Sequence, residues 1–107
     1  MTDKRIVLTT AGSEEEAQRI ALALVDARLA ACVNIVPHIE SVYRWQGEIE
    51  SSKEWLLIIK TATQRVSAIR EQIKELHSYE LPEHIVLNVE DGSPEYLAWL
   101  EESIREV

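Results

Sequence analysis

Four side chains are of the kinds that bind transition metals: one thiol and three imidazoles, at Cys32, His38, His77 and His84. Copper and zinc sites use three or four such ligands that converge on one point. None of the short spacings that arrange ligands in advance, such as Cys-x-x-Cys or His-x-x-x-His, is present. A site would therefore form only where folding, or symmetry between subunits, brings distant ligands together. We take His77, Cys32 and His38 as the candidate metal ligands.

Each candidate ligand also has a plainer interpretation. Cys32 lies among small apolar residues, where a free cysteine commonly packs as part of a core. His77 falls at the expected end of a helix and can interact with the helix dipole there. His38 directly follows Pro37 and can be exposed to solvent or lie at a subunit contact. The sequence leaves both interpretations open.

A second group of side chains could bind a small anion or transfer a proton. Lys60 ends an expected strand, and Tyr79, Glu80 and Glu83 lie in the loop before the next strand. If they meet at a cleft between subunits, a lysine–glutamate pair beside a tyrosine hydroxyl can do this chemistry. The alternative is an ion pair that fixes the register of an oligomer.

The motifs of several enzyme classes are missing. Gly12, Gly47 and Gly92 lie in separate expected turns, so the chain has no Gly-rich phosphate loop. Residues 10–13 are too short for the phosphate-binding loop of an acylphosphatase. The turn at Gln46-Gly47 is too tight for the long loop of a nucleotide sensor. We therefore expect no catalytic activity and no bound organic cofactor.

Composition and charge are typical of a small globular protein. The chain has 107 residues, 46% hydrophobic and 28% charged, which predicts one domain over residues 1–107. Its net charge of −8 opposes binding to nucleic acid or anionic membranes. No apolar run approaches the ~20 residues that span a bilayer. The single cysteine and the absence of a signal-peptide pattern at the start lead us to expect a cytoplasmic protein.

Hydrophobic patterns predict the elements that position these residues. Residues 4–10 are apolar and β-branched, which favours a strand. Ser13 and Glu16 match a capping box, and an apolar stripe over residues 17–25 predicts the helix that follows it.

The remaining pattern predicts a long hairpin, two more helices and a last strand. Residues 31–45 and 48–60 form the two hairpin strands. Thr63 caps a second helix, residues 85–90 form the last strand, and Ser93 caps a third helix. The order β-α-β-β-α-β with an extra C-terminal helix predicts a ferredoxin-like α+β fold. In this fold, both crossover helices cover one face of an antiparallel four-stranded sheet.

The hairpin is too long for the helices beneath it. Its first strand, residues 31–45, would span about 50 Å, whereas a helix of about 16 residues covers only about 24 Å. Pro37 cannot donate a ladder hydrogen bond and should mark a bulge or bend. The tip, with Tyr43, Trp45 and Ile49, therefore projects beyond the monomer core, and we expect it to form an oligomer interface.

Several stretches resemble the CutA family of divalent-cation tolerance proteins. They are Leu29-Ala30-Ala31-Cys32-Val33-Asn34-Ile35, Tyr43-Arg44-Trp45-Gln46-Gly47-Glu48-Ile49-Glu50, Ile59-Lys60-Thr61, Leu76-His77-Ser78-Tyr79-Glu80-Leu81-Pro82-Glu83 and Tyr96-Leu97-Ala98-Trp99-Leu100. The resemblance spans nearly the whole chain in the right order. It implies a ferredoxin-like homotrimer, similar in architecture to PII signalling proteins, with the long hairpins in sheets between subunits.

The resemblance also implies a function in divalent-cation tolerance, with copper foremost and Cu(II) or another divalent cation as the ligand. The alternative is a structural, interaction or signalling module of PII-like architecture without a specific metal site. Some members have a cysteine in the first strand, where this chain has Thr9, and two adjacent histidines where it has Leu76-His77. Of the copper ligands proposed for those members, the resemblance carries over only His77.

Overall fold

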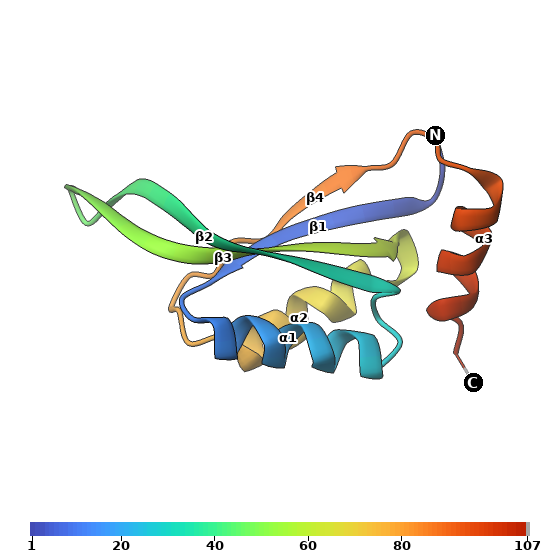
Figure 1. Cartoon of the computed structure of the whole chain (residues 1–107), viewed down its shortest axis with the longest axis horizontal. Helices are drawn as coiled ribbons and strands as arrows, with labels where there is room; N and C mark the ends of the chain where they lie inside the picture. The colour runs from blue at the N-terminus through green and yellow to red at the C-terminus, as the bar shows by residue number, and fades with distance from the viewer. Residues whose placement is uncertain (107) are drawn as a thin grey trace.

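Four antiparallel strands form one sheet in the order β2-β3-β1-β4 (Figure 1). The structure is a computed structural model and describes residues 1–106. Along the chain the elements are β1 (Lys4–Ala11), α1 (Glu14–Asp26), β2 (Cys32–Trp45), β3 (Glu48–Ala62), a 3₁₀ turn η1 (Thr63–Arg65), α2 (Val66–Leu76), β4 (Ile85–Asn88) and α3 (Pro94–Ser103). The predicted α+β class is confirmed.

Both crossover helices, α1 and α2, lie on the same face of the sheet (Figure 1). The core between helices and sheet consists of side chains without solvent exposure: Val7, Ala11, Ala17, Ile20, Leu24, Leu57, Ile59 and Ile69. Burial of each large aliphatic side chain contributes about 1.5–3 kcal/mol. A smaller cluster, Ala31, Ala62, Leu100 and Ile104, attaches α3 to one end of the sheet.

The start of α1 is only partly the predicted capping box. Ser13 Oγ accepts a hydrogen bond from Glu16 N at 3.1 Å, so the predicted N-cap is confirmed. The Glu16 carboxylate does not return to Ser13. Instead it accepts from Gly12 N at 3.3 Å and from Ser78 N at 2.8 Å. The reciprocal half of the box is replaced by a link to the loop before β4.

The other two helices start in different ways. Ser93 Oγ accepts from Tyr96 N at 3.3 Å and Pro94 is the first residue of α3, as predicted. Thr63 does not cap α2, so that prediction was wrong. Its hydroxyl donates to Asp3 O at 2.9 Å, and α2 begins at Val66 after η1.

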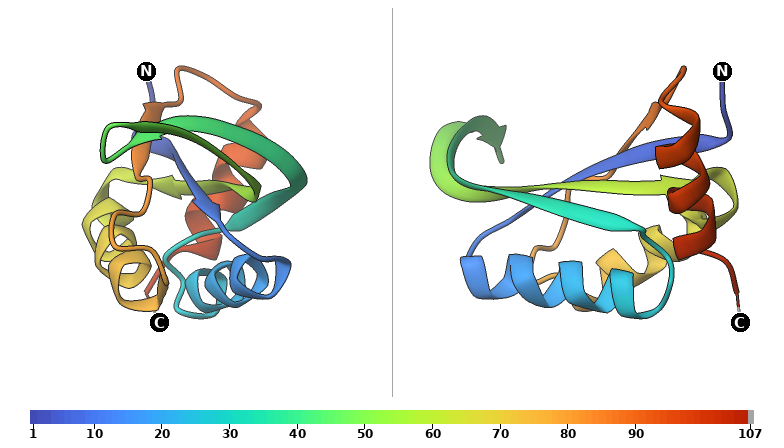
Figure 2. Two further views of the ribbon diagram at one scale, coloured as in Figure 1. Left: turned by 90° about the vertical axis from the view of Figure 1, so that its left-hand side faces the viewer. Right: turned by 45° about the vertical axis from the view of Figure 1, so that its right-hand side comes forward.

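The hairpin of β2 and β3 extends and curls well beyond the helices (Figure 2). The register shifts between Val36 and Ile39, so the bulge predicted around Pro37 is confirmed. Gln46 and Gly47 both have positive φ, 51° and 85°, as a two-residue type I′ turn requires. The bulge increases the local twist, so the distal half of the hairpin curves away from the sheet.

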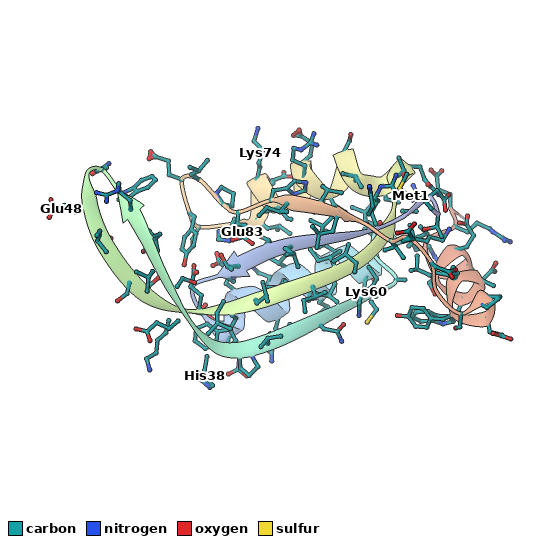
Figure 3. All side chains as sticks on the ribbon, turned by 90° about the horizontal axis from the view of Figure 1, so that it is seen from above. Met1, His38, Glu48, Lys60, Lys74 and Glu83 are labelled. Atoms are coloured by element: carbon teal, nitrogen blue, oxygen red, sulfur yellow. The ribbon has the colours of Figure 1, made fainter. Side chains whose placement is uncertain are left out.

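The face of the sheet opposite α1 and α2 is called the open face here. Because side chains alternate along a strand, Val7 points to the helices while Ile6 and Leu8 point to the open face. By the same alternation and the strand register, the open face also includes Thr10, Cys32, Asn34, Leu56, Ile58, Lys60, Ile85 and Leu87. Ile85 and Leu87 are 48% and 43% exposed. Figure 3 looks onto this apolar, uncovered surface.

Candidate functional site

A cleft of about 810 Å³ opens between the distal half of the hairpin and the loop that joins α2 to β4. The hairpin side of the cleft includes Tyr43, Trp45, Glu50 and Glu54, and the loop side includes Tyr79, Glu80, Leu81, Pro82, Glu83 and His84. Four of these residues are glutamates, and no lysine or arginine lines the cleft in the described chain. We call it the acidic cleft; Glu83 marks its loop side in Figure 3.

The deepest charged group in the acidic cleft is Glu54. Its residue is only 6% exposed, and its Oε2 accepts a hydrogen bond from the Tyr79 hydroxyl at 2.7 Å. Burial and the Glu54 carboxylate both raise the pKa of Tyr79, so its hydroxyl stays protonated and acts as the donor. Gly12 lets the tyrosine approach, because a Cβ at that position would lie 2.9 Å from Tyr79 Oη.

Glu83 lies close enough to Glu54 for the two charges to interact. Burial, and then the charge of Glu54, raise the pKa of the Glu83 carboxyl. A carboxyl group whose ionisation is opposed by a neighbouring carboxylate favours the approach of a positive group. The acidic cleft is therefore suited to a cation and unsuited to an anion.

Glu16 holds the loop side of the cleft in position. Burial alone would raise the pKa of this carboxyl, but the hydrogen bonds from Ser78 and Gly12 outweigh that effect and lower it. A charged Glu16 therefore binds the backbone just before Tyr79. The charge stabilises the cleft wall without lining the cleft itself.

His77 is 9% exposed, and both of its ring nitrogens have partners within the subunit. Nε2 lies 2.6 Å from Thr10 O, and Nδ1 accepts from Tyr79 N at 3.0 Å. Because a carbonyl can only accept, Nε2 carries the proton. A metal could bind this ring only if one of these hydrogen bonds were broken.

The other two candidate ligands lie on β2. Cys32 is partly buried at the start of the strand, with Lys60 Nζ 3.8 Å from its sulfur. His38 sits in the bulge with a positive φ of 58° and packs its ring on Trp55, with centroids 5.5 Å apart. His77, Cys32 and His38 are not brought together within the subunit, since no group of three or more histidine, cysteine or carboxylate residues suited to a metal occurs in residues 1–106.

Lys60 does not join Tyr79 and Glu83 within one subunit. Its Nζ donates to Asn34 Oδ1, toward the other end of the open face (Figure 3). Lys60 and Glu54 are six residues apart on β3, which corresponds to about 20 Å along a strand. A cluster of all three sequence candidates would need a second copy of the chain.

Two further polar side chains have buried atoms without a hydrogen-bond partner within residues 1–106. They are Thr9, through its hydroxyl, and His84, through both ring nitrogens. Burial and then the charge of Arg70 lower the pKa of His84, so its ring is neutral near pH 7. Thr9 has no solvent exposure. These atoms are too few to make a metal site by themselves.

The residues predicted for an oligomer interface are exposed at the hairpin tip. Tyr43 and Trp45 are 40% and 37% exposed, and Ile49 is 69% exposed. Tyr43 also has Ser52 across the hairpin, with their hydroxyl oxygens 3.4 Å apart. In the subunit, nothing within residues 1–106 fully covers these large side chains.

The chain matches the family model described as CutA1 divalent ion tolerance protein over residues 5–103. It belongs to the CutA1 family. A relative named divalent-cation tolerance protein CutA, from Thermus thermophilus, is 50% identical over 100 residues, which cover 94% of this chain and 97% of the relative. This match agrees with the resemblance predicted from the sequence motifs.

The CutA1 fold is equally clear from solved structures. The structure of CutA from Xylella fastidiosa has a TM-score of 0.95 and 41% identity, and the match covers 97% of this chain and all of that one. A longer relative, named Protein CutA 1, chloroplastic, from Oryza sativa, is 45% identical over 94% of this chain and 57% of its own length. Within residues 1–106, no helix combines the length and apolar character needed to cross a membrane.

Proposed function

We propose that this CutA1-family chain is a cytoplasmic homotrimer that binds or responds to divalent metal ions, with copper foremost. The observation that carries the proposal is the family match over residues 5–103, because the family is described by its divalent ion tolerance. A ferredoxin-like subunit and a PII-like arrangement of three copies complete the proposal. The sheet order β2-β3-β1-β4 supports the ferredoxin-like subunit.

The exposed surface of the subunit supports the homotrimer. Val42, Ile49 and Leu81 are each about 70% exposed around the hairpin and the acidic cleft. Large apolar surfaces of this kind are typical of protein contacts. Other copies would cover the open face and the hairpin tip, adding core that a chain of 107 residues cannot build alone.

The donor set constrains how a metal ion could bind. His77 is occupied by Thr10 and Tyr79, and one subunit holds no group of three suitable ligands in its described residues. If Cys32 and His38 are ligands, they must be completed by other copies, so binding would saturate at one ion per chain for a site between two neighbouring copies, or at one ion per trimer for a site on the symmetry axis.

Titration of Cu(II) into the purified protein by calorimetry tests the metal proposal. We expect saturable binding with about micromolar or tighter affinity. Cys32→Ser and His38→Asn should each weaken the binding of Cu(II). Asp26→Asn, at the end of α1, serves as the control. Heats that depend only on ionic strength would contradict metal binding.

The second candidate function is an interaction module without a specific metal site. The internal hydrogen bonds of His77 favour it, because they give that ring a structural role. In this case Cu(II) would leave the unfolding temperature unchanged, and a partner protein would co-purify with the full chain.

A further inference from the structure

We propose that the acidic cleft of one subunit binds the Lys60 ammonium of a second copy, so that the cleft is completed only across a subunit interface. This inference rests on the proposed homotrimer and adds the contact that would set its register.

The cleft lacks a positive charge of its own. Glu54 is only 6% exposed to solvent. No basic side chain of residues 1–106 lies within ion-pair distance of its carboxylate. A buried carboxylate without a cation is costly. The raised pKa of Glu83, from burial and from Glu54, fits a pair of carboxyl groups with no ammonium nearby in the subunit.

Lys60 is the matching unpaired cation. Alternation along the strands directs two lysines, Lys4 and Lys60, to the open face. Lys4 is already paired with Asp3 at 2.8 Å and with Glu101 at 2.5 Å. In the described chain, the Lys60 ammonium contacts only the side chains of Asn34 and Cys32, and neither of them is a carboxylate.

The two charged sites cannot meet within one subunit. Lys60 pairs across the sheet with Ile6 on β1, whereas Ile85, which lines the acidic cleft, lies on β4 and pairs with Leu8. On β3 itself, Lys60 and Glu54 are separated by about 20 Å. Their opposite charges therefore lie at two ends of the same face (Figure 3).

A surface with opposite charges at its two ends is suited to head-to-tail contact. Such a contact uses two different patches and closes into a ring when the rotation between copies allows it. Apolar side chains between the two ends, including Leu8 and Ile58, would exclude water and strengthen the ion pair. The aromatic walls from Tyr43 and Trp45 suit the methylene groups and the charge of a lysine.

The acidic cleft fits an ammonium better than a metal ion. Although four glutamates line it, no three histidine, cysteine or carboxylate groups within residues 1–106 are gathered closely enough to hold a metal. An ammonium needs only one carboxylate and a hydrogen-bond acceptor or two. Glu54 already has Tyr79 on Oε2, and its other oxygen remains available.

A double-mutant cycle on the dissociation of the full-length oligomer tests this contact. We compare the wild type with Lys60→Met, Glu54→Gln and the double variant by sedimentation equilibrium, at a urea concentration at which the wild-type trimer partly dissociates. Each single change should raise the dissociation constant by roughly tenfold or more. The double change should raise it little further than one single change does, because both remove the same ion pair. Lys53→Met removes the same charge from the opposite side of the hairpin and should change little.

The outcomes separate this contact from the proposed oligomer. If Lys60→Met leaves the dissociation constant of the trimer unchanged, or if the effects of the two single changes are strictly additive, the contact is overturned. The proposed trimer is then unaffected. A wild type that stays monomeric would overturn both. Should Glu54→Gln fail to fold by circular dichroism, Glu83→Gln replaces it in the cycle, with the same coupling expected.

Discussion

Glu16, in the first turn of α1, joins the backbone just before the helix to the distant loop before β4 through one carboxylate. It accepts from Gly12 N and from Ser78 N, 62 residues away in sequence. The residue is 5% exposed, so these bonds replace contacts with water. Burial would raise its pKa, but the two donors outweigh burial and lower it. The folded chain therefore favours the charged form.

Replacing this carboxylate should destabilise the subunit in a pH-dependent way. We expect Glu16→Gln to lower the free energy of unfolding by about 1–3 kcal/mol near pH 7, because it weakens two charge-assisted hydrogen bonds. Folding lowers the pKa of Glu16, so its contribution to the free energy of unfolding is fully present above pH 4.5, the ordinary pKa of a glutamate. The contribution is lost as the pH falls through the pKa of Glu16 in the folded chain. Urea unfolding at neutral and acidic pH measures this.

The matched control is Glu15→Gln, one residue earlier on the exposed side of the same helical turn. It removes the same charge near the helix N-terminus without touching Ser78. If both variants lose equal stability, or if the loss for Glu16→Gln grows at acidic pH, the assigned role of Glu16 is wrong.

Single residues of the site were only partly predictable. Tyr79 and Glu83 belong to the polar cluster that the sequence predicts, and both line the acidic cleft. The sequence does not single out Glu54, because a glutamate in a hairpin looks exposed until Tyr79, 25 residues later, packs over it. Alternation does predict its face, but alternation carries no information about depth.

At the scale of elements, the hairpin was the most predictable feature. Its turn chemistry at Gln46-Gly47 and the missing amide hydrogen of Pro37 are local properties, so both the tight turn and the bulge follow from the sequence. The last strand was predicted to residue 90 but ends at Asn88. The pairing of β4 with β1 ends at the pair Asn88–Arg5, and local patterns do not encode such a limit.

The exposed hairpin tip gives a prediction about assembly. Ile49 is 69% exposed in the subunit, so Ile49→Ser should change the stability of the isolated subunit by less than about 0.5 kcal/mol. If another copy covers the tip, the same change should raise the dissociation constant of the oligomer by roughly tenfold or more. Sedimentation equilibrium of the variant and the wild type, at a urea concentration at which the wild type partly dissociates, measures the dissociation constant.

Leu22→Ser is the matched control for this change. Leu22 is 72% exposed on α1, away from the hairpin. The Leu22→Ser change removes an apolar side chain of similar size and should leave the dissociation constant of the oligomer unchanged. Equal weakening by both variants would mean that the hairpin tip has no special part in assembly.

At the scale of the whole molecule, the subunit has two unlike surfaces. The helical layer closes over a complete core, whereas the open face and the hairpin remain apolar and largely uncovered. The chain measures 45 × 26 × 22 Å, and its long dimension includes the projecting hairpin. A net charge of −8 keeps copies apart in general. We therefore expect any specific association to depend on apolar contact and on local complementarity of the kind proposed for Lys60 and the acidic cleft.

The mass of the native protein tests most directly whether other copies cover the open face and the hairpin. Sedimentation equilibrium over a wide range of concentrations should give one species of three times the chain mass of 12.2 kDa. The trimer should persist on dilution, because large apolar surfaces are withdrawn from water. A single species of 12.2 kDa throughout that range would contradict the account.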